Sequence, residues 1–299
     1  METVAKENMF YSFSKDREAA VTVPSGTTLT LETYDCFENQ VTEEGDNYGE
    51  IDWDRINPAT GPVYIEEAEP GDCLKVTINK IELADYGMMA VGKGLGVMKE
   101  EMEDLIFKKI PLRQNKGDFG YGISLDLNPM IGVIGVAPEG EAVSNGTPGD
   151  HGGNMDNKKI KEGAVLYFPV SAPGALFGLG DMHAAMGDGE VGVTGIEAAG
   201  RATVTFEVIK NKQLTMPLLE NETEIGVISS AATLEEGIHR AVSFLAGLLA
   251  RESDMDKNNA VMFLSAAGQV EVCQVVDPLV TVRMMLQKKD LEPLNISFP

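Results

Sequence analysis

The sequence holds few of the residues that build disulfide frameworks or sulfur-rich metal sites. Cysteine occurs only three times in 299 residues, at Cys36, Cys73 and Cys273. The number is odd, the positions lie far apart and no CxxC pair occurs, which argues against both a disulfide framework and a thiolate zinc site. We expect reduced, mostly buried thiols.

Long hydrophobic runs are also missing. The longest apolar stretch, AVSFLAGLLA at 241–250, is too short to span a bilayer. The first twenty residues carry charges throughout and contain no apolar run of signal-peptide length. We therefore predict a cytoplasmic protein that does not associate with membranes.

Positive charge is scarce relative to negative charge. Lys and Arg number 24 against 47 Asp and Glu, so the formal net charge is −23. Such a chain repels phosphate backbones and anionic lipids, which makes nucleic acid and membranes poor partners and cations better ones. A surface kept soluble by its charge is a second explanation of the acidity.

Several motifs of nucleotide binding and covalent catalysis are absent. The glycines at 92, 94 and 96 form GxGxG rather than GxGxxG, and no Walker lysine-serine pair follows a glycine run. The sequence also lacks a GxSxG elbow and an HExxH helix. Dinucleotide chemistry and a Ser or Cys nucleophile therefore have little support.

Short segments of alternating polarity dominate the chain and predict strands. They lie at 28–35, 73–83, 165–170, 201–209 and 270–276. In CLKVTINKIEL, Leu74, Val76 and Ile78 share one face, as in a half-buried antiparallel strand. We predict a mainly β (α+β) fold with β-sandwich-like antiparallel sheets.

Two helices are expected near the C-terminus. Thr233 with Glu236 forms a capping box ahead of an apolar stripe, and Ser253 with Asp256 repeats the pattern. These segments predict a C-terminal helical hairpin packed on the sheet.

The segment 85–111 is rich in glycine and methionine. It contains KEEMEDLIFKK (99–109), which we expect to form an acidic helix. The whole segment is either a mobile flap over a pocket or a plain surface insertion. No repeat or linker divides the chain, so residues 1–299 are predicted to form a single intertwined β-rich domain.

Histidine and acidic residues gather in GDMHAAMGDGEVGVTGIE at 180–197. Asp181 and His183 have a spacing that places both side chains on one face of an extended segment. A glycine turn then brings back Asp188 and Glu190, and Glu197 follows. Because divalent cations prefer carboxylate and imidazole ligands, this segment predicts a metal site.

A second polar cluster lies upstream, in GDHGGNMD at 149–156. It offers four candidate side chains, those of Asp150, His151, Asn154 and Asp156. A further candidate, Asp35, ends the strand in ETYDCF, whereas His239 belongs to the first helix and is expected to be structural. Each residue alone is explained as a turn, a cap or a solvated charge. Together they favour a metal or amide-binding site.

At these residues the sequence resembles the acetamidase/formamidase family. The resemblance rests on TGPVYIEEAEPGDCLKVTI (60–78), HGGNMD (151–156), FPVSAPGALFGLGDMHAAMGDGEV (168–191) and the Glu197 that follows. It implies hydrolysis of a short aliphatic amide, acetamide or formamide, to the carboxylate and ammonia. It also implies a β-rich fold unrelated to serine amidases, a divalent metal and a homo-oligomer, for which we expect a dimer.

The candidate roles combine this resemblance with the chemistry of amide hydrolysis. The expected metal ligands are Asp181, His183, Asp156, Asp35 and Glu190, with zinc or calcium as the expected ion and magnesium and manganese still open. Glu190 is the expected general base and later proton donor. The expected oxyanion donors are Asn154 and the backbone N–H groups of Gly152 and Gly153.

Two other functions fit the same residues. One is a calcium-stabilised protein that binds a small metabolite without turnover. The other is an amidase whose acids work as an acid/base pair without metal. Chelation separates them, because it would lower the stability of the first and leave the turnover of the second intact.

Overall fold

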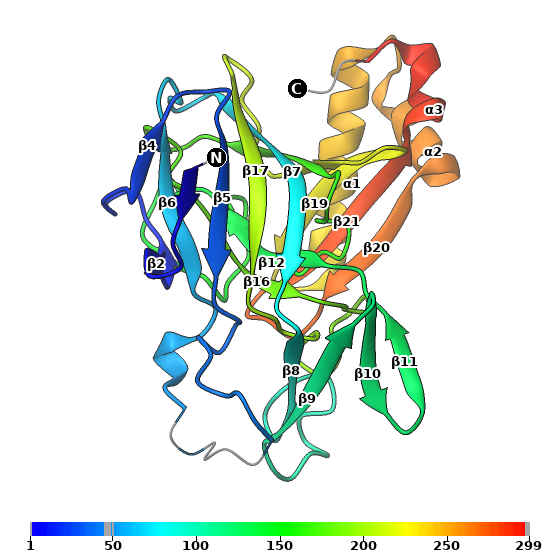
Figure 1. Cartoon of the computed structure of the whole chain (residues 1–299). Coiled ribbons are helices and arrows are strands. Elements are labelled where there is room, and N and C mark those ends of the chain that lie inside the picture. Colours follow the sequence, from blue (N-terminus) through cyan, green and yellow to red (C-terminus); the bar gives the residue numbers. More distant parts are fainter. Residues whose placement is uncertain (1, 45–48, 50, 297–299) are drawn as a thin grey trace.

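The computed structural model describes residues 2–44, 49 and 51–296 (Figure 1). Its largest element is a nine-stranded sheet, antiparallel except for the parallel pair of its first two strands. The order is β1 (Glu2–Val4), β5 (Thr28–Thr33), β17 (Gly200–Ile209), β7 (Cys73–Leu83), β15 (Val165–Pro169), β18 (Leu218–Glu220), β19 (Glu224–Ala231), β21 (Val280–Gln287) and β20 (Gln269–Gln274). Segments far apart in the sequence therefore pair side by side.

A second sheet packs against the first. Its order is β14 (Gly152–Asn154), β12 (Met130–Gly135), β16 (Phe177–His183), β6 (Ala59–Ile65) and β2 (Met9–Phe10), and β4 (Val21–Val23) also pairs with β6. The main hydrophobic core lies between the two sheets, where the rings of Phe177 and Phe206 meet at 5.0 Å between centroids. The β-sandwich-like, antiparallel fold class is confirmed.

The expected strands are present, and the burial pattern of β7 shows why alternating polarity predicted them. Leu74, Val76 and Ile78 are fully buried, whereas the polar residues between them are partly exposed. Their cross-strand partners on β15 and β17 extend the same buried face of the sheet. A small two-stranded sheet of β3 (Ser12–Phe13) and β13 (Val143–Ser144) lies outside these layers.

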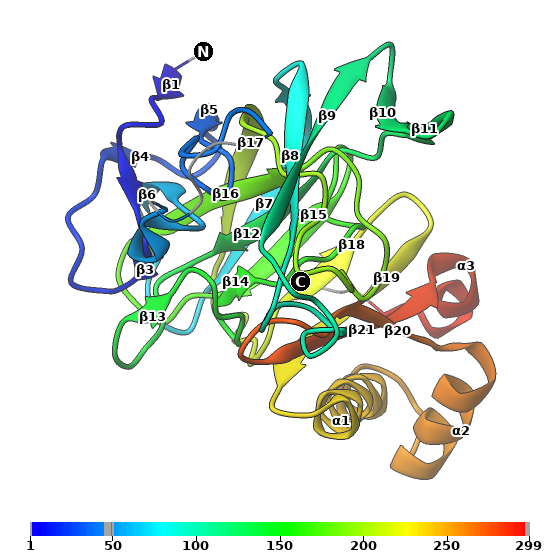
Figure 2. The same ribbon diagram turned by 90° about the horizontal axis from the view of Figure 1, so that it is seen from below.

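The helices form the expected C-terminal hairpin on the β19–β21 end of the large sheet (Figure 2). They are α1 (Leu234–Glu252) and α2 (Lys257–Ala267), followed by the short α3 (Lys288–Leu291); 3₁₀ turns occur at Trp53–Arg55 and Glu292–Leu294. None of the helices in the described ranges is long and apolar enough to cross a bilayer.

One helix start differs from its prediction. Thr233 caps α1 as expected and accepts a hydrogen bond from the Glu236 N–H. The cap of α2 is Asp256, which accepts from the Asn259 N–H, and not Ser253. Ser253 instead ends α1, because its hydroxyl donates to the Leu249 carbonyl.

The acidic helix expected at 99–109 is wrong. Residues 99–104 lie in turns and a bend, and the chain then enters a strand at Ile106. This strand belongs to a four-stranded antiparallel sheet made of β8 (Tyr86–Val91), β9 (Ile106–Arg113), β10 (Lys116–Gly120) and β11 (Ile123–Asp126), drawn at the lower end of Figure 1. The segment forms a strand because its apolar residues pack on both sides of the sheet, with Ile110 and Leu112 buried on one face of β9 and Phe107 buried on the other. Whether this sheet moves as a flap stays a prediction.

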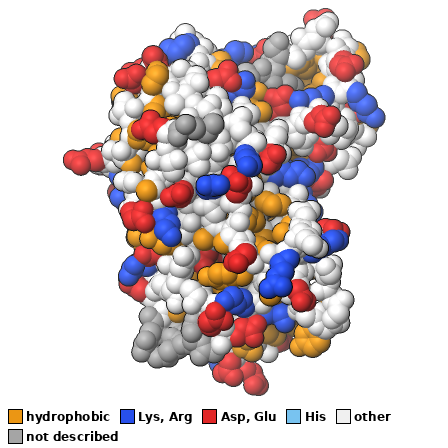
Figure 3. All heavy atoms as spheres, viewed as in Figure 1, with side chains coloured by type: hydrophobic (Ala, Val, Ile, Leu, Met, Phe, Trp, Pro, Cys, Tyr) orange, Lys and Arg blue, Asp and Glu red, His pale blue; other side chains and the backbone are white. Residues whose placement is uncertain are grey.

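Acidic and basic side chains alternate over the face shown in Figure 3, without a continuous patch of one sign. Several of the acidic residues pair with lysine or arginine, as Glu82 does with Arg201 at 3.1 Å. This part of the surface therefore fits the second explanation of the acidity, charge that keeps the protein soluble.

Candidate active site

Asp181 and His183 lie on β16, the middle strand of the second sheet. Both line a cavity of about 350 Å³. Their side chains converge as the spacing predicts, with His183 Nε2 3.5 Å from Asp181 Oδ1. The backbone at Asp181 is left-handed (φ 54°), a conformation that costs energy for a residue with a side chain.

Asp156 reaches the same cavity from the segment after β14. Its Oδ1 lies 3.7 Å from His183 Nε2. A Cβ atom on Gly132 of β12 would lie only 2.4 Å from Asp156 Oδ1 and 2.5 Å from Asp181 Oδ2. The absence of a side chain at Gly132 is therefore what lets the two carboxylates meet over β12.

The loop between β16 and β17 supplies two more carboxylates. Glu190 Oε1 lies 3.8 Å from His183 Nδ1, and Glu197 Oε2 lies 3.1 Å from His183 Nε2. Glu197 is held against β8 by two backbone hydrogen bonds with Met88, each of 2.8 Å. The loop thus places both side chains beside His183. For Glu190 this position was predicted from the glycine turn in GDGE.

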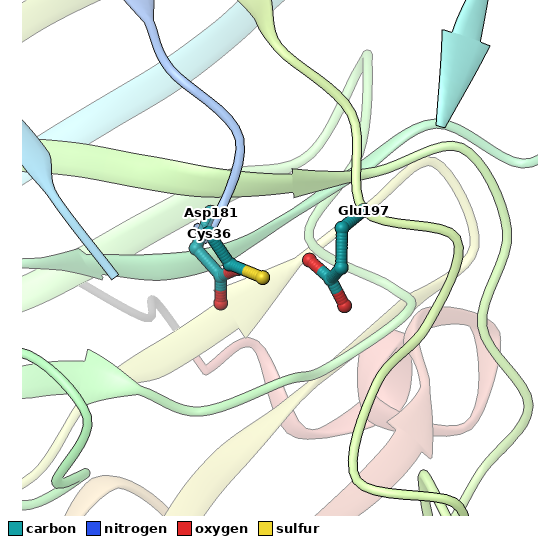
Figure 4. A group of neighbouring side chains, drawn as sticks. All are labelled: Cys36, Asp181 and Glu197. Atoms are coloured by element: carbon teal, nitrogen blue, oxygen red, sulfur yellow. The ribbon is translucent and has the colours of Figure 1, made fainter. Parts of the chain in front are cut away.

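Two residues of the cavity were missed by the sequence analysis. Asp277, in the loop after β20, accepts a hydrogen bond of 2.9 Å from Asn154 Nδ2. Cys36 is buried and faces Asp181 and Glu197 (Figure 4). Asp277 stands in VVDPLV without a recognisable motif, and the only signal for Cys36 is its position directly after Asp35 at a strand end.

Other candidates lie elsewhere. Asp188 bonds to Arg283 and Lys158 and does not line the cavity around His183, which favours its interpretation as a turn residue over a site role. Asp150 pairs with Arg240 of α1.

Two of the remaining candidates have structural surroundings. His151 is buried against the ring of Phe13, and His239 is exposed on α1. Asp35 does not line the cavity, and its Oδ1 accepts the N–H groups of Phe37 and Asn39. This arrangement favours a positioning role for Asp35 over a ligand role.

The cavity concentrates negative charge. Five carboxyl groups line it, from Asp156, Asp181, Glu190, Glu197 and Asp277, and its described lining includes neither Lys nor Arg. Burial raises the pKa of Asp156 to about 7 and that of Glu197 to about 8, and it also raises the pKa of Glu190. Like charges this close cannot all be ionised unless a cation is present.

His183 is the one basic group in this cluster. Burial opposes its positive charge, but the carboxylates of Glu197 and Asp181 outweigh burial and raise its pKa well above the ordinary value. A single imidazolium nevertheless cannot balance five carboxylates.

The donor atoms fit a divalent cation. Both carboxylate oxygens of Asp156 and the Nδ1 atom of His183 are buried and have no hydrogen-bond partner within the described part of the chain. Buried polar atoms without partners are uncommon in folded proteins. Asp156, His183 and Glu190 each offer one ligand atom, and these atoms lie within 4.8 Å of one another. Carboxylate oxygen and imidazole nitrogen are suitable ligands for zinc and manganese, and the carboxylates also suit calcium.

Comparison with known proteins places these residues in a family. The model of the acetamidase/formamidase family matches residues 2–146 and 139–239. A solved structure described as a predicted acetamidase/formamidase from the thermophile Thermoanaerobacter tengcongensis is 44% identical, covers 99% of each chain and superposes with a TM-score of 0.97. An acetamidase from Bacillus halodurans is 40% identical over 98% of this chain and 100% of its own, with a TM-score of 0.96.

Curated relatives match over a smaller share. A formamidase from Methylophilus methylotrophus is 42% identical in a match that covers 63% of this chain and 61% of that protein. The matches span 61% to 67% of the length of the curated relatives. With the family model over most of its length and close structural relatives over nearly all of it, the chain belongs to the acetamidase/formamidase family.

Proposed function

We propose that the protein hydrolyses a short aliphatic amide, such as formamide or acetamide, to the carboxylate and ammonia in the cavity around His183. The observation that carries this proposal is the buried group of carboxylates around one imidazole, with donor atoms that lack partners. Relatives named acetamidase and formamidase support the same chemistry. The cavity of about 350 Å³ lies at the small end of ligand pockets, which suits a small substrate.

We further propose that the reaction is assisted by a divalent cation. Asp156, His183 and Glu190 would hold it, with Asp181 beside His183. A bound cation of this kind polarises a carbonyl and lowers the pKa of water. Asp35 is left out of this ligand set because its Oδ1 already accepts two backbone N–H groups.

Glu190 is also the proposed general base, through the carboxylate oxygen that would not hold the cation. It accepts a proton as the water oxygen bonds to the amide carbon, and returns that proton to the nitrogen as the C–N bond breaks and ammonia leaves. Burial and the neighbouring Asp156 raise its pKa, which brings a carboxyl group closer to the range in which it can both take and give a proton near neutral pH.

Asn154 is the proposed donor to the oxyanion. One of its amide hydrogens goes to Asp277, which leaves the second hydrogen for the substrate. Gly152 is a poor partner in this role because its N–H donates to the Gly149 carbonyl at 3.1 Å. Neither Gly152 nor Gly153 lines the cavity.

Ammonia release tests the proposal. Purified protein is assayed with formamide, acetamide and propionamide, before and after chelation, and after zinc, manganese or calcium is added back. We expect turnover to be lost on chelation and restored by one metal. No turnover with any amide, together with a melting temperature lowered by chelation, would favour the calcium-stabilised binding protein. Turnover that survives chelation but is lost in Asp181→Asn and Glu190→Gln would favour the metal-free acid/base pair.

We also propose that the chain acts in the cytoplasm, as a single unit within a homo-oligomer, most simply a dimer. The large sheet supports the single unit, because it joins strands from both ends of the chain, from β1 and β5 to β20 and β21, in one continuous layer. Sedimentation of the purified protein tests the dimer, and cell fractionation tests the location.

A further inference from the structure

We propose that Cys36 is a thiolate ligand to a divalent cation of the zinc class, held together with the carboxylates of Asp181 and Glu197. This inference rests on the cation-assisted function proposed above. It concerns a second group of donor atoms in the same cavity, beside the group formed by Asp156, His183 and Glu190.

The backbone fixes Cys36 at the wall of the cavity. The side chain of Asp35 closes the turn around it by accepting the N–H groups of Phe37 at 3.0 Å and Asn39 at 2.7 Å. The carbonyl of Cys36 accepts the N–H of Asn57 at 2.7 Å. With only 5% of the residue exposed, the thiol is held inside the protein and lines the cavity.

Three segments bring their donor atoms together at this point. The Cys36 sulfur and one carboxylate oxygen each from Asp181 and Glu197 lie within 4.8 Å of one another. Figure 4 shows the sulfur pointing toward Glu197, with Asp181 beside it. The three residues come from the loop after β5, from β16 and from the loop before β17, so the grouping is not a consequence of local sequence.

A second observation points to a missing partner. Glu197 is 2% exposed, and its Oε2 has no hydrogen-bond partner within the described residues. His183 Nε2, the one basic group beside this oxygen, lies 3.1 Å from it but does not form a hydrogen bond with it. A buried carboxylate oxygen without a hydrogen bond is only partly compensated for its lost solvation, and a cation would supply the missing contact.

The chemistry of the thiol decides between a nucleophile and a ligand. Cys36 is buried beside two acidic side chains, and the described lining of its cavity includes neither Lys nor Arg that would activate it as a nucleophile. A divalent cation at this point would bind the sulfur as a thiolate, because coordination releases the proton.

A thiolate also discriminates among metals. Soft sulfur ligands favour zinc, whereas calcium, magnesium and manganese prefer oxygen ligands. The expectation that this chain has no thiolate metal site rested on the spacing of its cysteines, and a mixed Cys/carboxylate group has no such spacing signature.

Cobalt substitution provides the test. The protein as purified is stripped of metal and loaded with Co²⁺, and its absorption spectrum is recorded together with the amount of bound metal. Coordination by a thiolate gives a sulfur-to-cobalt charge-transfer band in the near ultraviolet. We expect the band in the wild type and its loss in Cys36→Ser, which keeps a weaker oxygen donor in place of sulfur.

The other two cysteines are matched controls. Cys73 and Cys273 are also free and buried, but neither belongs to a group of potential ligands in the described chain. Cys73→Ser and Cys273→Ser should keep the band. A band that persists in Cys36→Ser, or bound cobalt without a band in the wild type, overturns the inference while the amidase proposal stands. Failure to bind any cobalt overturns the inference and the cation-assisted mechanism together, and ammonia release by the stripped protein would then leave only the hydrolytic activity.

Competition between zinc and calcium gives a readout that does not depend on spectra or activity. Loss of groups that merely orient a metal ligand costs about 10–100-fold in affinity. Replacement of the sulfur itself should therefore lower the zinc-to-calcium affinity ratio by at least about tenfold in Cys36→Ser. An unchanged ratio in this variant would also overturn the ligand role of Cys36.

Discussion

The buried guanidinium of Arg283 donates a hydrogen bond of 2.8 Å to Asp188, two residues before Glu190. The same guanidinium donates to Asn157, the neighbour of Asp156, at 3.0 Å. Arg283 is fully buried on β21 and also bonds to Glu271. One arginine of the C-terminal strands thus ties down both segments that carry site carboxylates.

Removal of this arginine should be strongly destabilising. Arg283→Met removes the buried partner of Asp188 and Glu271, and breaking a buried ion pair costs up to about 3–5 kcal/mol. The two carboxylates keep Lys158 and Lys159 as partners, so the cost should lie at or below the lower end of this range. The measurement is the free energy of unfolding in urea. Arg251→Met is the matched control, because Arg251 pairs with Glu252 in an exposed position and should change stability by less than about 1 kcal/mol. Equal effects of the two substitutions would contradict the role given to Arg283.

Replacement of the proposed base should separate chemistry from folding. Glu190→Gln keeps the shape of the side chain but cannot accept the proton of water, so kcat should fall by about 10²–10⁴-fold. The measurement is ammonia release with the preferred amide, at saturating metal. Glu162→Gln, at an exposed position, is the control and should leave kcat unchanged. Near-normal turnover of Glu190→Gln would remove Glu190 from the mechanism.

A methyl group at Gly132 should separate the two carboxylates above it. Gly132→Ala would place a Cβ atom 2.4 Å from Asp156 Oδ1, so the carboxylates must move apart. We expect a loss of metal affinity and of amide turnover of at least about tenfold, in line with changes that disturb ligand orientation. Equilibrium dialysis and the ammonia assay measure the two effects. Gly140→Ala is the control, since a Cβ atom there meets nothing within 4 Å; similar metal affinity in both variants would count against the convergence of Asp156 and Asp181.

The buried His151 should make stability depend on pH. Burial lowers its pKa from the ordinary 6.5 to about 4. Between these values the unfolded chain binds a proton that the folded chain does not, so stability falls as the pH is lowered from 6.5 to 4. The loss is about 1.4 kcal/mol per pH unit and at most about 3 kcal/mol in total.

Urea unfolding across this pH range checks the prediction. His151→Leu should remove this part of the slope, so the stability of the wild type relative to this variant should rise with pH between 4 and 6.5 and level off above 6.5. His239→Leu replaces an exposed histidine on α1 and serves as the control. A variant of His151 that keeps the full slope of the wild type would show that other groups cause it.

The strands and the first helix could be predicted because their signals are local. Alternation along β7 reports a single buried face, and the Thr233 hydroxyl caps α1 from only three residues away. The prediction of an acidic helix at 99–109 was wrong because the deciding interaction is not local. The charged residues of this segment favour a helix, but the chain from Ile106 onward pairs with β8, and that pairing depends on residues outside the segment.

The site was predicted in part. Asp181 and His183 were predicted as site residues from their spacing on one strand. Asp156 and Glu190 were predicted from the glycine-rich motifs that carry the resemblance to the family. Asp188 belongs to the same motif, yet its side chain turns to Arg283, nearly a hundred residues further along the chain.

The sequence by itself determined that this is a β-rich chain whose acidic and histidine residues are concentrated near His183, because alternation and short motifs are properties of neighbouring residues. Only the tertiary structure decided which of those residues meet. Cys36 and Asp277 reach the cavity through the pairing of distant strands, and no local pattern reports which side chains the two sheets bring within a few ångströms of one another.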